Sequence, residues 1–321
     1  MKRTRFLRFT AAVLLVLLLP LPAALASQAD AGDGPVIEIR DRADLIAMRE
    51  QPDGNYLLMN DIDMQGMNWY PLHFSGVFDG GGHTISNLHI VQMNMLVKKS
   101  VDGNHRGYQT YFAGFFASAD KAVIRDLHLV NESVGIRTKG NCFAAGLVGW
   151  SSKTEITGCS VSGRITLYVS GKMCGVAGIM GYGDGTVTDC ETDVTLVLVD
   201  ENREVKCEEF LGGVQACGYA DIENCLVKLD GYASVHGYVH NGGIVGMHHI
   251  HPRDKKHVGY IRGCQVDGSI TFFEDNDDRR AYCKAYVGEK LNEQVVLSNN
   301  TTIRFDSIEV KEFDTPLLPQ A

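Results

Sequence analysis

Two aspartates of this 321-residue chain could form the carboxylate pair of a glycan-cleaving enzyme. Asp126 and Asp189 occupy the same position in two copies of a recurring sequence box, with one copy between them. If the copies stack as neighbouring strands, two steps separate them by about 9.6 Å, near the upper end for an inverting glycosidase pair. The other copies carry Asn87, Gly158, Asn224 and Gly263 there. A small polar turn residue explains this series, so we expect no catalytic residue here.

Histidines gather in one lengthened connection of the chain. His248, His249 and His251, with His257 close behind, carry ring nitrogens that could hold a transition metal. Asp254 is the nearest carboxylate, and no alternation fixes the direction of these side chains. We favour an enlarged surface loop over a metal site and expect no cofactor.

The segment 274–278, Glu-Asp-Asn-Asp-Asp, is dense in oxygen ligands that calcium would accept. It lacks the glycine and the closing glutamate of an EF-hand loop. A solvated acidic turn is the better interpretation, with calcium binding as the alternative.

Eight of the nine cysteines fall into two rows. One row shares a box position: Cys159, Cys190, Cys225 and Cys264. The other lies about four residues before a box glycine: Cys142, Cys174 and, in similar places, Cys207 and Cys283. In-register neighbours lie about 4.8 Å apart with parallel Cβ directions, a poor match to the ~3.8 Å Cβ separation of a disulfide. We favour free thiols packed as small core residues, and disulfides are the alternative.

An internal repeat positions all of these residues. Its first box reads small-Gly-apolar-apolar and usually closes with Gly; the shared glycines are Gly114, Gly146, Gly178, Gly213 and Gly243. Its second box is a β-branched residue, an apolar or Cys residue three positions later, and usually a β-branched or Leu residue two after that. The copies begin at Ile85, Ile124, Ile156, Val187, Ile222 and Ile261, with a worn copy at Val296.

These repeats predict an all-β fold. They contain short alternating segments and no long helical pattern, and one repeat cannot bury its apolar face unless others stack on it. The segment 72–251 has no proline, as expected where backbone N–H groups serve strand ladders. We predict a coiled parallel β-solenoid of about seven coils. A short helix over Asp41–Arg49, with Leu45, Ile46 and Met48 on its apolar side, would cap its first end.

The first 26 residues have the features of a secretory signal. A basic start, the apolar run 11–19 and Ala24-Leu25-Ala26 fit a cleaved signal peptide, and the run is too short to span a bilayer. We expect residues 27–40 to form a linker and first strand, 41–75 the N-terminal cap, 76–305 the β-helix repeats, and 306–321 a C-terminal strand and tail. The protein is expected to be secreted, or extracellular and associated with the cell surface, without stable membrane insertion. Its net charge of -9 argues against nucleic acid as a partner.

The N-terminal part of the chain resembles the opening of bacterial surface proteins that carry GLUG repeats. The similar residues are Gly54–Met64, Trp69 and Phe74–Ile85. GLUG repeats read Gly-Gly-Leu-Val-Gly followed by an Ile-x-Asn-Cys-x-Val box, and Ala145–Val161 is close to this pattern. The copy at Gly212–Ala216 departs from it.

This resemblance covers roughly residues 36–305 and implies a right-handed parallel β-helix. The family includes secreted adhesin-like proteins and the N-terminal regions of some immunoglobulin-A-cleaving metallopeptidases. Peptidase activity is not implied, because that chemistry needs a His-Glu-x-x-His helix and the chain contains no His-Glu pair.

The copies of the repeat differ most in three insertions: Val91–Thr110, Asp200–Glu209 and the histidine-rich connection. Long loops on a rigid scaffold usually carry binding specificity, and Tyr108, Tyr111 and Phe112 would add aromatic surface. We expect a non-catalytic, adhesin-like recognition protein that binds a host protein, a glycan or an envelope component. A polysaccharide lyase or glycoside hydrolase on the same scaffold is the alternative, and a passive spacer is a weaker one. The ligand and the oligomeric state stay open.

Overall fold

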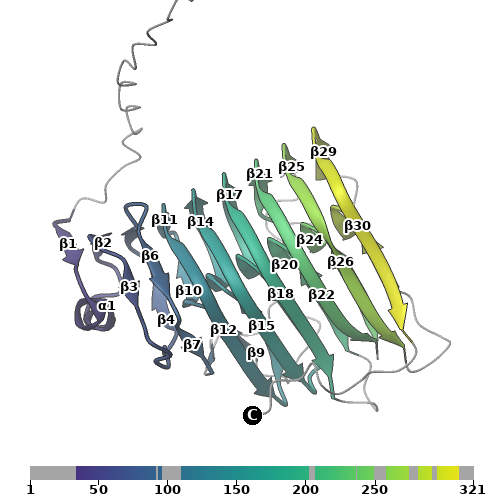
Figure 1. Cartoon of the computed structure of the whole chain (residues 1–321), viewed down its shortest axis with the longest axis horizontal. Coiled ribbons are helices and arrows are strands. Elements are labelled where there is room, and N and C mark those ends of the chain that lie inside the picture. Colours follow the sequence, from purple (N-terminus) through teal and green to yellow (C-terminus); the bar gives the residue numbers. More distant parts are fainter. Residues whose placement is uncertain are drawn as a thin grey trace, which may run out of the picture. The chain divides into compact units, whose positions relative to one another are not determined.

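The computed structural model describes residues 34–91, 93–95, 110–201, 207–235, 237–248, 258–274, 281–290 and 295–310. Within these residues most of the chain lies in β-strands, which form three sheets. The helical elements there are α1 (Arg42–Ala47) and the 3-10 turn η1 (Met48–Glu50). The prediction of an all-β fold is confirmed (Figure 1).

The largest sheet has fourteen strands. They are β1 (Val36–Ile39), β2 (Asn55–Leu58), β4 (Leu72–Phe74), β5 (Val77–Asp79), β10 (Phe116–Asp120), β11 (Val123–Arg125), β14 (Val148–Thr157), β17 (Met180–Thr188), β20 (Gln215–Gly218), β21 (Asp221–Glu223), β24 (Val245–His248), β25 (Gly259–Arg262), β28 (Val287–Lys290) and β29 (Val295–Ser298).

The other two sheets have nine and seven strands. The nine-stranded sheet contains β3 (Ile62–Asp63), β6 (Thr84–Ser86), β7 (His89–Ile90), β12 (His128–Thr138), β15 (Ser160–Val169), β18 (Glu191–Asp200), β22 (Leu226–Val235), β26 (Gln265–Glu274) and β30 (Thr301–Val310). The seven-stranded sheet contains β8 (Asn94–Met95), β9 (Thr110–Ala113), β13 (Asn141–Ala145), β16 (Met173–Ala177), β19 (Glu208–Gly212), β23 (Tyr238–Gly242) and β27 (Ala281–Lys284).

Each strand pairs in parallel with the equivalent strand of the next repeat. In the nine-stranded sheet, Val161 of β15 pairs with Leu129 of β12 on one side and with Thr192 of β18 on the other. The same one-repeat step runs through all three sheets, and the antiparallel pair β8–β9 is the exception among the described strands. This regular pairing is compatible with a β-solenoid.

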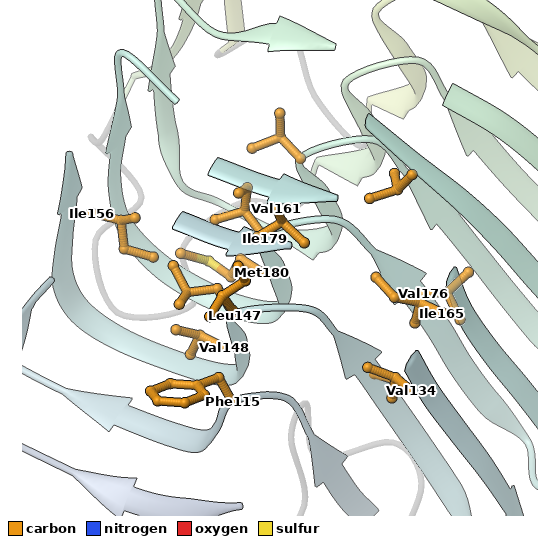
Figure 2. Close-up of a cluster of buried hydrophobic side chains, with 14 of the residues drawn as sticks. Phe115, Val134, Leu147, Val148, Ile156, Val161, Ile165, Val176, Ile179 and Met180 are labelled. Carbon is orange, nitrogen blue, oxygen red and sulfur yellow. The ribbon is translucent and has the colours of Figure 1, made fainter. Parts of the chain in front are cut away.

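The glycines of the first box lie where two layers approach too closely for a side chain. A Cβ added at Gly146 would lie 2.7 Å from Glu132 Oε2 and 2.8 Å from the carbonyl oxygen of Gly178. The apolar residues after the glycine enter the core. Leu147 and Ile179 are fully buried beside Val148 and Met180 (Figure 2). The glycine therefore lets the chain turn while its neighbours supply the core.

The copy of the first box that departs from the pattern still keeps the register. Gln215 pairs with Met180 and Val245, both apolar, and is itself fully buried. Its amide nitrogen donates to the carbonyl oxygen of Gly183 at 3.1 Å, and its Oε1 accepts from the Ala220 N–H at 3.3 Å. A buried polar side chain is tolerated here because its polar atoms are bonded.

Two copies of the second box were placed wrongly from the sequence. Ile85 pairs with Leu129 in the nine-stranded sheet, whereas Phe78 is the residue that pairs with Ile124. At the other end Ile261 pairs with Leu297, one residue beyond the predicted start at Val296. The physical reason is that several spaced apolar residues satisfy the same short pattern, and only strand pairing selects among them.

The predicted N-terminal helix is present as α1 followed by η1. Asp41 caps α1, because its side chain accepts from the backbone N–H groups of Ala43 and Asp44. Leu45 and Met48 are fully buried as predicted, but Ile46 is 40% exposed. The expectation that Ile46 belongs to the apolar side was therefore wrong.

Candidate functional site

Asp126 and Asp189 lie in the sharp turn that joins the fourteen-stranded sheet to the nine-stranded sheet. Both have left-handed backbones, with φ of 49° and 54°. The equivalent residues of the other repeats share this conformation: Gly158 (63°), Asn224 (53°), Gly263 (66°) and Asn299 (55°). Glycine, asparagine and aspartate adopt it most easily. Asn87 also has a positive φ, but it follows β6 and so belongs to a different turn, which corrects its place in the predicted series.

We call these six equivalent residues, one from each repeat, the turn row. Their side chains contact the turn of the neighbouring repeat. A Cβ at Gly158 would lie 2.5 Å from Asp126 Oδ1, so the Asp126 carboxylate fills the space over that glycine. Asn224 Nδ2 donates to Asp189 Oδ1 at 3.2 Å, and Asn224 Oδ1 lies in turn against Gly263. Asp126 and Asn224 therefore each lie over the glycine of the next repeat, while Asp189 and Asn224 bond to each other.

The structure brings Asp126 and Asp189 to one row but separates them by Gly158. Burial raises the pKa of Asp126, and the charge of Asp79 raises it further, while Arg125 and His128 lower it. Arg125 Nε lies 2.8 Å from Asp79 Oδ2. A carboxyl with a raised pKa can serve as a general acid, and this is the one chemical feature that favours the enzymatic alternative.

A strip of polar side chains beside Asp126 was not anticipated from the sequence. His128 Nδ1 lies 2.8 Å from Ser160 Oγ, between adjacent strands. His83 Nδ1 lies 3.3 Å from Asp61 Oδ1, which also accepts from the Thr84 N–H. These bonds lower the pKa of Asp61, with the Thr84 bond as the largest cause. The residue two positions after the turn aspartate could have signalled this strip, because it points outward in every repeat.

His248 is the last residue of β24 and is buried at 2% exposure. It pairs with Gly218, and its ring lies against Gly259, where an added Cβ would be 2.6 Å from His248 Nε2. His249 and His251 lie outside the described residues, as do residues 275–278 of the acidic segment. In the part of the chain that the structure describes, no three His, Cys, Asp or Glu side chains are placed to hold a metal ion.

The first cysteine row lies in the core directly after the turn row. Each thiol donates to the carbonyl oxygen two residues before it: Cys159 at 3.5 Å, Cys190 at 3.2 Å, Cys225 at 3.3 Å and Cys264 at 3.4 Å. Eight of the nine cysteines are buried, Cys283 is half-buried, and none is bonded to another in this structure. The prediction that the row packs into the core is confirmed.

The second cysteine row runs along the seven-stranded sheet. Cys142 pairs with Cys174, and Cys207 precedes the next strand, with its sulfur 3.2 Å from that of Cys174. Cys283 pairs instead with Asn241 in the following strands.

The insertions add residues without shifting the strand register. Asp200 pairs with Val169 before the second insertion, and Glu208 pairs with Met173 after it. The chain thus has seven residues between these two pairs, where it has three, 170–172, one repeat earlier. Around the histidine-rich connection, His248 pairs with Gly218 and Ile261 with Ile222.

Most of the first insertion, with Tyr108, lies outside the described residues. Its strand β8 pairs with β9 and so adds an antiparallel strand to the seven-stranded sheet. Tyr111 is half-buried, whereas Phe112 is 1% exposed and stacks on Phe143 with ring centroids 6.1 Å apart. The expectation that Phe112 contributes aromatic surface was wrong, because its strand turns it toward the neighbouring layer.

Among the described residues, no helix is long and apolar enough to cross a bilayer. No family model and no curated protein matches this chain. The likeness to GLUG-repeat proteins therefore rests on the two sequence boxes alone, and the parallel pairing of the strands is consistent with a β-helix-like fold.

Proposed function

We propose that the chain is a right-handed parallel β-helix of about seven coils, with α1 as its N-terminal cap. The parallel one-repeat pairing in all three sheets supports this architecture. Burial of Leu45 and Met48 beside the first strands supports the role of α1, since an open solenoid end exposes core and strand edges.

On this scaffold we propose a non-catalytic, exported, adhesin-like protein that binds a host protein, a glycan or an envelope component. The observation that carries this proposal is the unbroken register across the insertions. Residues 201–206 and 249–258 are not needed to continue the ladders, because residues 170–171 and Tyr219 make the same connections in the repeat before. Loop segments that the strand ladders do not require are available to bind a ligand.

Contacts at the start of the second insertion support this role. Arg137 lies over the ring of Tyr168, with its guanidinium carbon 4.6 Å from the ring centroid, and its Nη2 lies 3.3 Å from Glu201 Oε1. Glu201 is the first residue after β18, so side chains from two earlier repeats hold the start of the insertion in place. An insertion whose start is held in place loses less conformational entropy when it binds a ligand.

The basic start, apolar run and Ala24-Leu25-Ala26 support export, and the GLUG-like boxes support a cell-surface setting. Arrays of glycans and of host surface proteins, probed with the mature chain, test the proposal. Saturable binding to one class of ligand is expected. Absence of binding on both arrays would contradict it.

A glycan-cleaving enzyme is the second candidate, favoured by the raised pKa of Asp126. Incubation with a panel of acidic polysaccharides distinguishes the two functions. An enzyme would release new chain ends and lose this activity in Asp126→Asn or Asp189→Asn, whereas a binding protein would show no turnover.

A further inference from the structure

Two of the nine cysteines are set apart by their geometry. The sulfur atoms of Cys174 and Cys207 lie 3.2 Å apart, closer than either lies to any backbone acceptor given for it. Cys174 belongs to β16, and Cys207 directly precedes β19, the next strand of the seven-stranded sheet. Both side chains are fully buried. The pair therefore joins two neighbouring repeats within the core.

The first cysteine row does not single out a pair in this way. Cys190 contacts the thiols of both Cys159 and Cys225, so its neighbours are equivalent. Each thiol of that row also donates to a carbonyl oxygen of its own turn, as described above. In-register strands hold such sulfurs on parallel Cβ directions, which disfavours a disulfide. Cys174 and Cys207 are not register partners, because Cys174 pairs with Glu209.

The two thiols of the pair are chemically unequal. The bond from Cys174 is the largest single influence on the pKa of Cys207 and lowers it, but burial and the charges of Glu209, Asp200 and Glu208 together leave the pKa above its usual value. Burial raises the pKa of Cys174 well above its usual range, and the bond to Cys207 raises it further. In the packed core Cys207 is therefore the more readily ionised thiol of the pair, whereas before packing either thiol can supply the thiolate that attacks a disulfide.

We propose that Cys174 and Cys207 form the disulfide site of this protein, oxidised by exchange with a small disulfide such as oxidised glutathione. The Cys207 thiolate attacks the oxidant, forms a mixed disulfide and releases one thiolate. Cys174 then loses its proton to solvent and attacks Cys207 Sγ, which forms the Cys174–Cys207 bond and releases the second thiolate. The protein loses two electrons and two protons, and the oxidant becomes two thiols.

Because both sulfur atoms are buried, the disulfide can form only at an early stage of folding. A small disulfide cannot reach either thiol in the packed core, so exchange precedes complete packing of β16 against β19. Once formed, the bond attaches the end of the second insertion to the repeat before it. The other seven cysteines stay thiols.

Refolding in a redox buffer tests the proposal on the full chain. The protein is unfolded and reduced, refolded with oxidised and reduced glutathione, alkylated, and digested with trypsin and an Asp/Glu-specific protease without reduction. Lys172 and Asp184 flank Cys174, and Lys206 and Glu208 flank Cys207, so both fall on peptides free of other cysteines. We expect one linked peptide pair, Cys174 with Cys207, and a melting temperature about 5–10 °C above that of the reduced protein.

Three serine variants provide the controls. Cys174→Ser and Cys207→Ser should lose the linked peptide and the rise in melting temperature, and Cys225→Ser should keep both. Alkylation of Cys174 and Cys207 after refolding, or linkage of either to another cysteine such as Cys142, would overturn the proposal. If a serine variant fails to fold, the peptide map of the unaltered protein still decides the question.

Discussion

Asn300 and Cys264 make the same two contacts, each with the repeat before it. Cys264 Sγ accepts from the Cys225 N–H at 3.5 Å and donates to the Ile222 carbonyl at 4.0 Å. Asn300 Oδ1 accepts from the Cys264 N–H at 2.9 Å, and its Nδ2 donates to the Ile261 carbonyl at 2.8 Å. An amide thus takes the place of a thiol at the last turn of the row, with shorter hydrogen bonds.

Replacing Asn300 should therefore destabilise the C-terminal end of the ladder in proportion to the bonds lost. Asn300→Leu removes both and leaves a backbone N–H and a carbonyl without partners, at an expected cost of about 2 kcal/mol. Asn300→Cys restores the weaker thiol contacts and should cost about half as much. Urea unfolding measures the loss in the free energy of unfolding for both variants. Asn299→Gly is the matched control, because the φ of 55° at Asn299 suits glycine; an equal loss in all three variants would contradict this account.

The turn row predicts a coupling between Asp126 and Gly158. Gly158→Ala places a methyl group 2.5 Å from Asp126 Oδ1 on a backbone with φ of 63°, so we expect a loss of about 2–3 kcal/mol. Asp126→Gly should cost less than 1 kcal/mol, since glycine occupies this position in other repeats. The double variant should recover about 1 kcal/mol of the alanine penalty. Strict additivity in a double-mutant cycle would show that the two residues do not interact.

Glu132 makes the stability of the fold fall as the pH rises. Its side chain is buried in the core, neither carboxylate oxygen has a hydrogen-bond partner among the described residues, and burial raises its pKa well above the usual range. In the unfolded chain it ionises near pH 4.3. Above that pH the unfolded chain has lost a proton that the folded chain keeps, so the free energy of unfolding decreases until the folded pKa is reached.

Glu132→Gln should therefore stabilise the protein relative to the unaltered chain, by up to about 1.4 kcal/mol for each pH unit above 4.3. Below pH 4 the stabilisation should vanish. Chemical denaturation between pH 4 and pH 8 gives both values. Glu191→Gln, at an exposed position of β18, is the matched Glu-to-Gln control. If Glu132→Gln changed the free energy of unfolding by the same amount at every pH, the proposed ionisation of Glu132 would be contradicted.

Thiol accessibility gives a further prediction. Cys283 is the half-buried cysteine, and burial raises its pKa to about 11, while the other eight side chains are buried. In the reduced, native protein at pH 8 we expect Cys283 to react slowly with Ellman's reagent before any other thiol, and all nine to react in guanidinium. Cys283→Ser should remove the slow native phase. Rapid reaction of several thiols without denaturant would contradict the packed rows.

Much of this fold could be predicted from the sequence because the repeat boxes are short and local. The glycines and the apolar residues after them mark turns and core, and both hold in the structure. The boxes alone did not give Ile85 or Asn300 their correct positions, because the sparse apolar pattern is also satisfied seven residues after Phe78 and one residue before Leu297. The last copy of the first box, Ala285–Gly288, was also missed, since alanine replaces its glycine and tyrosine its aliphatic residue.

The candidate site was less predictable for a different reason. Asp126 and Asp189 were placed correctly in one row, but the contacts that decide their role come from Gly158 and Asp79, which stand on neighbouring repeats. His128 and Ser160 meet only because strands 32 positions apart in sequence pair in register. Glu132 faces the core because β12 has an irregularity between Leu129 and Glu132, and no box residue signals it.

The central claim is that recognition and folding use different parts of the chain, and shortening the insertions tests it most directly. In one variant Ser-Gly replaces residues 201–206, which retains Cys207, and in another Tyr replaces residues 249–258, which retains Gly259; both connections are then as short as those of the preceding repeats. We predict that both variants keep the melting temperature within about 3 °C, since the core is unchanged, and that ligand binding falls at least tenfold in one of them. A variant that unfolds, or full binding by both together, would contradict the claim.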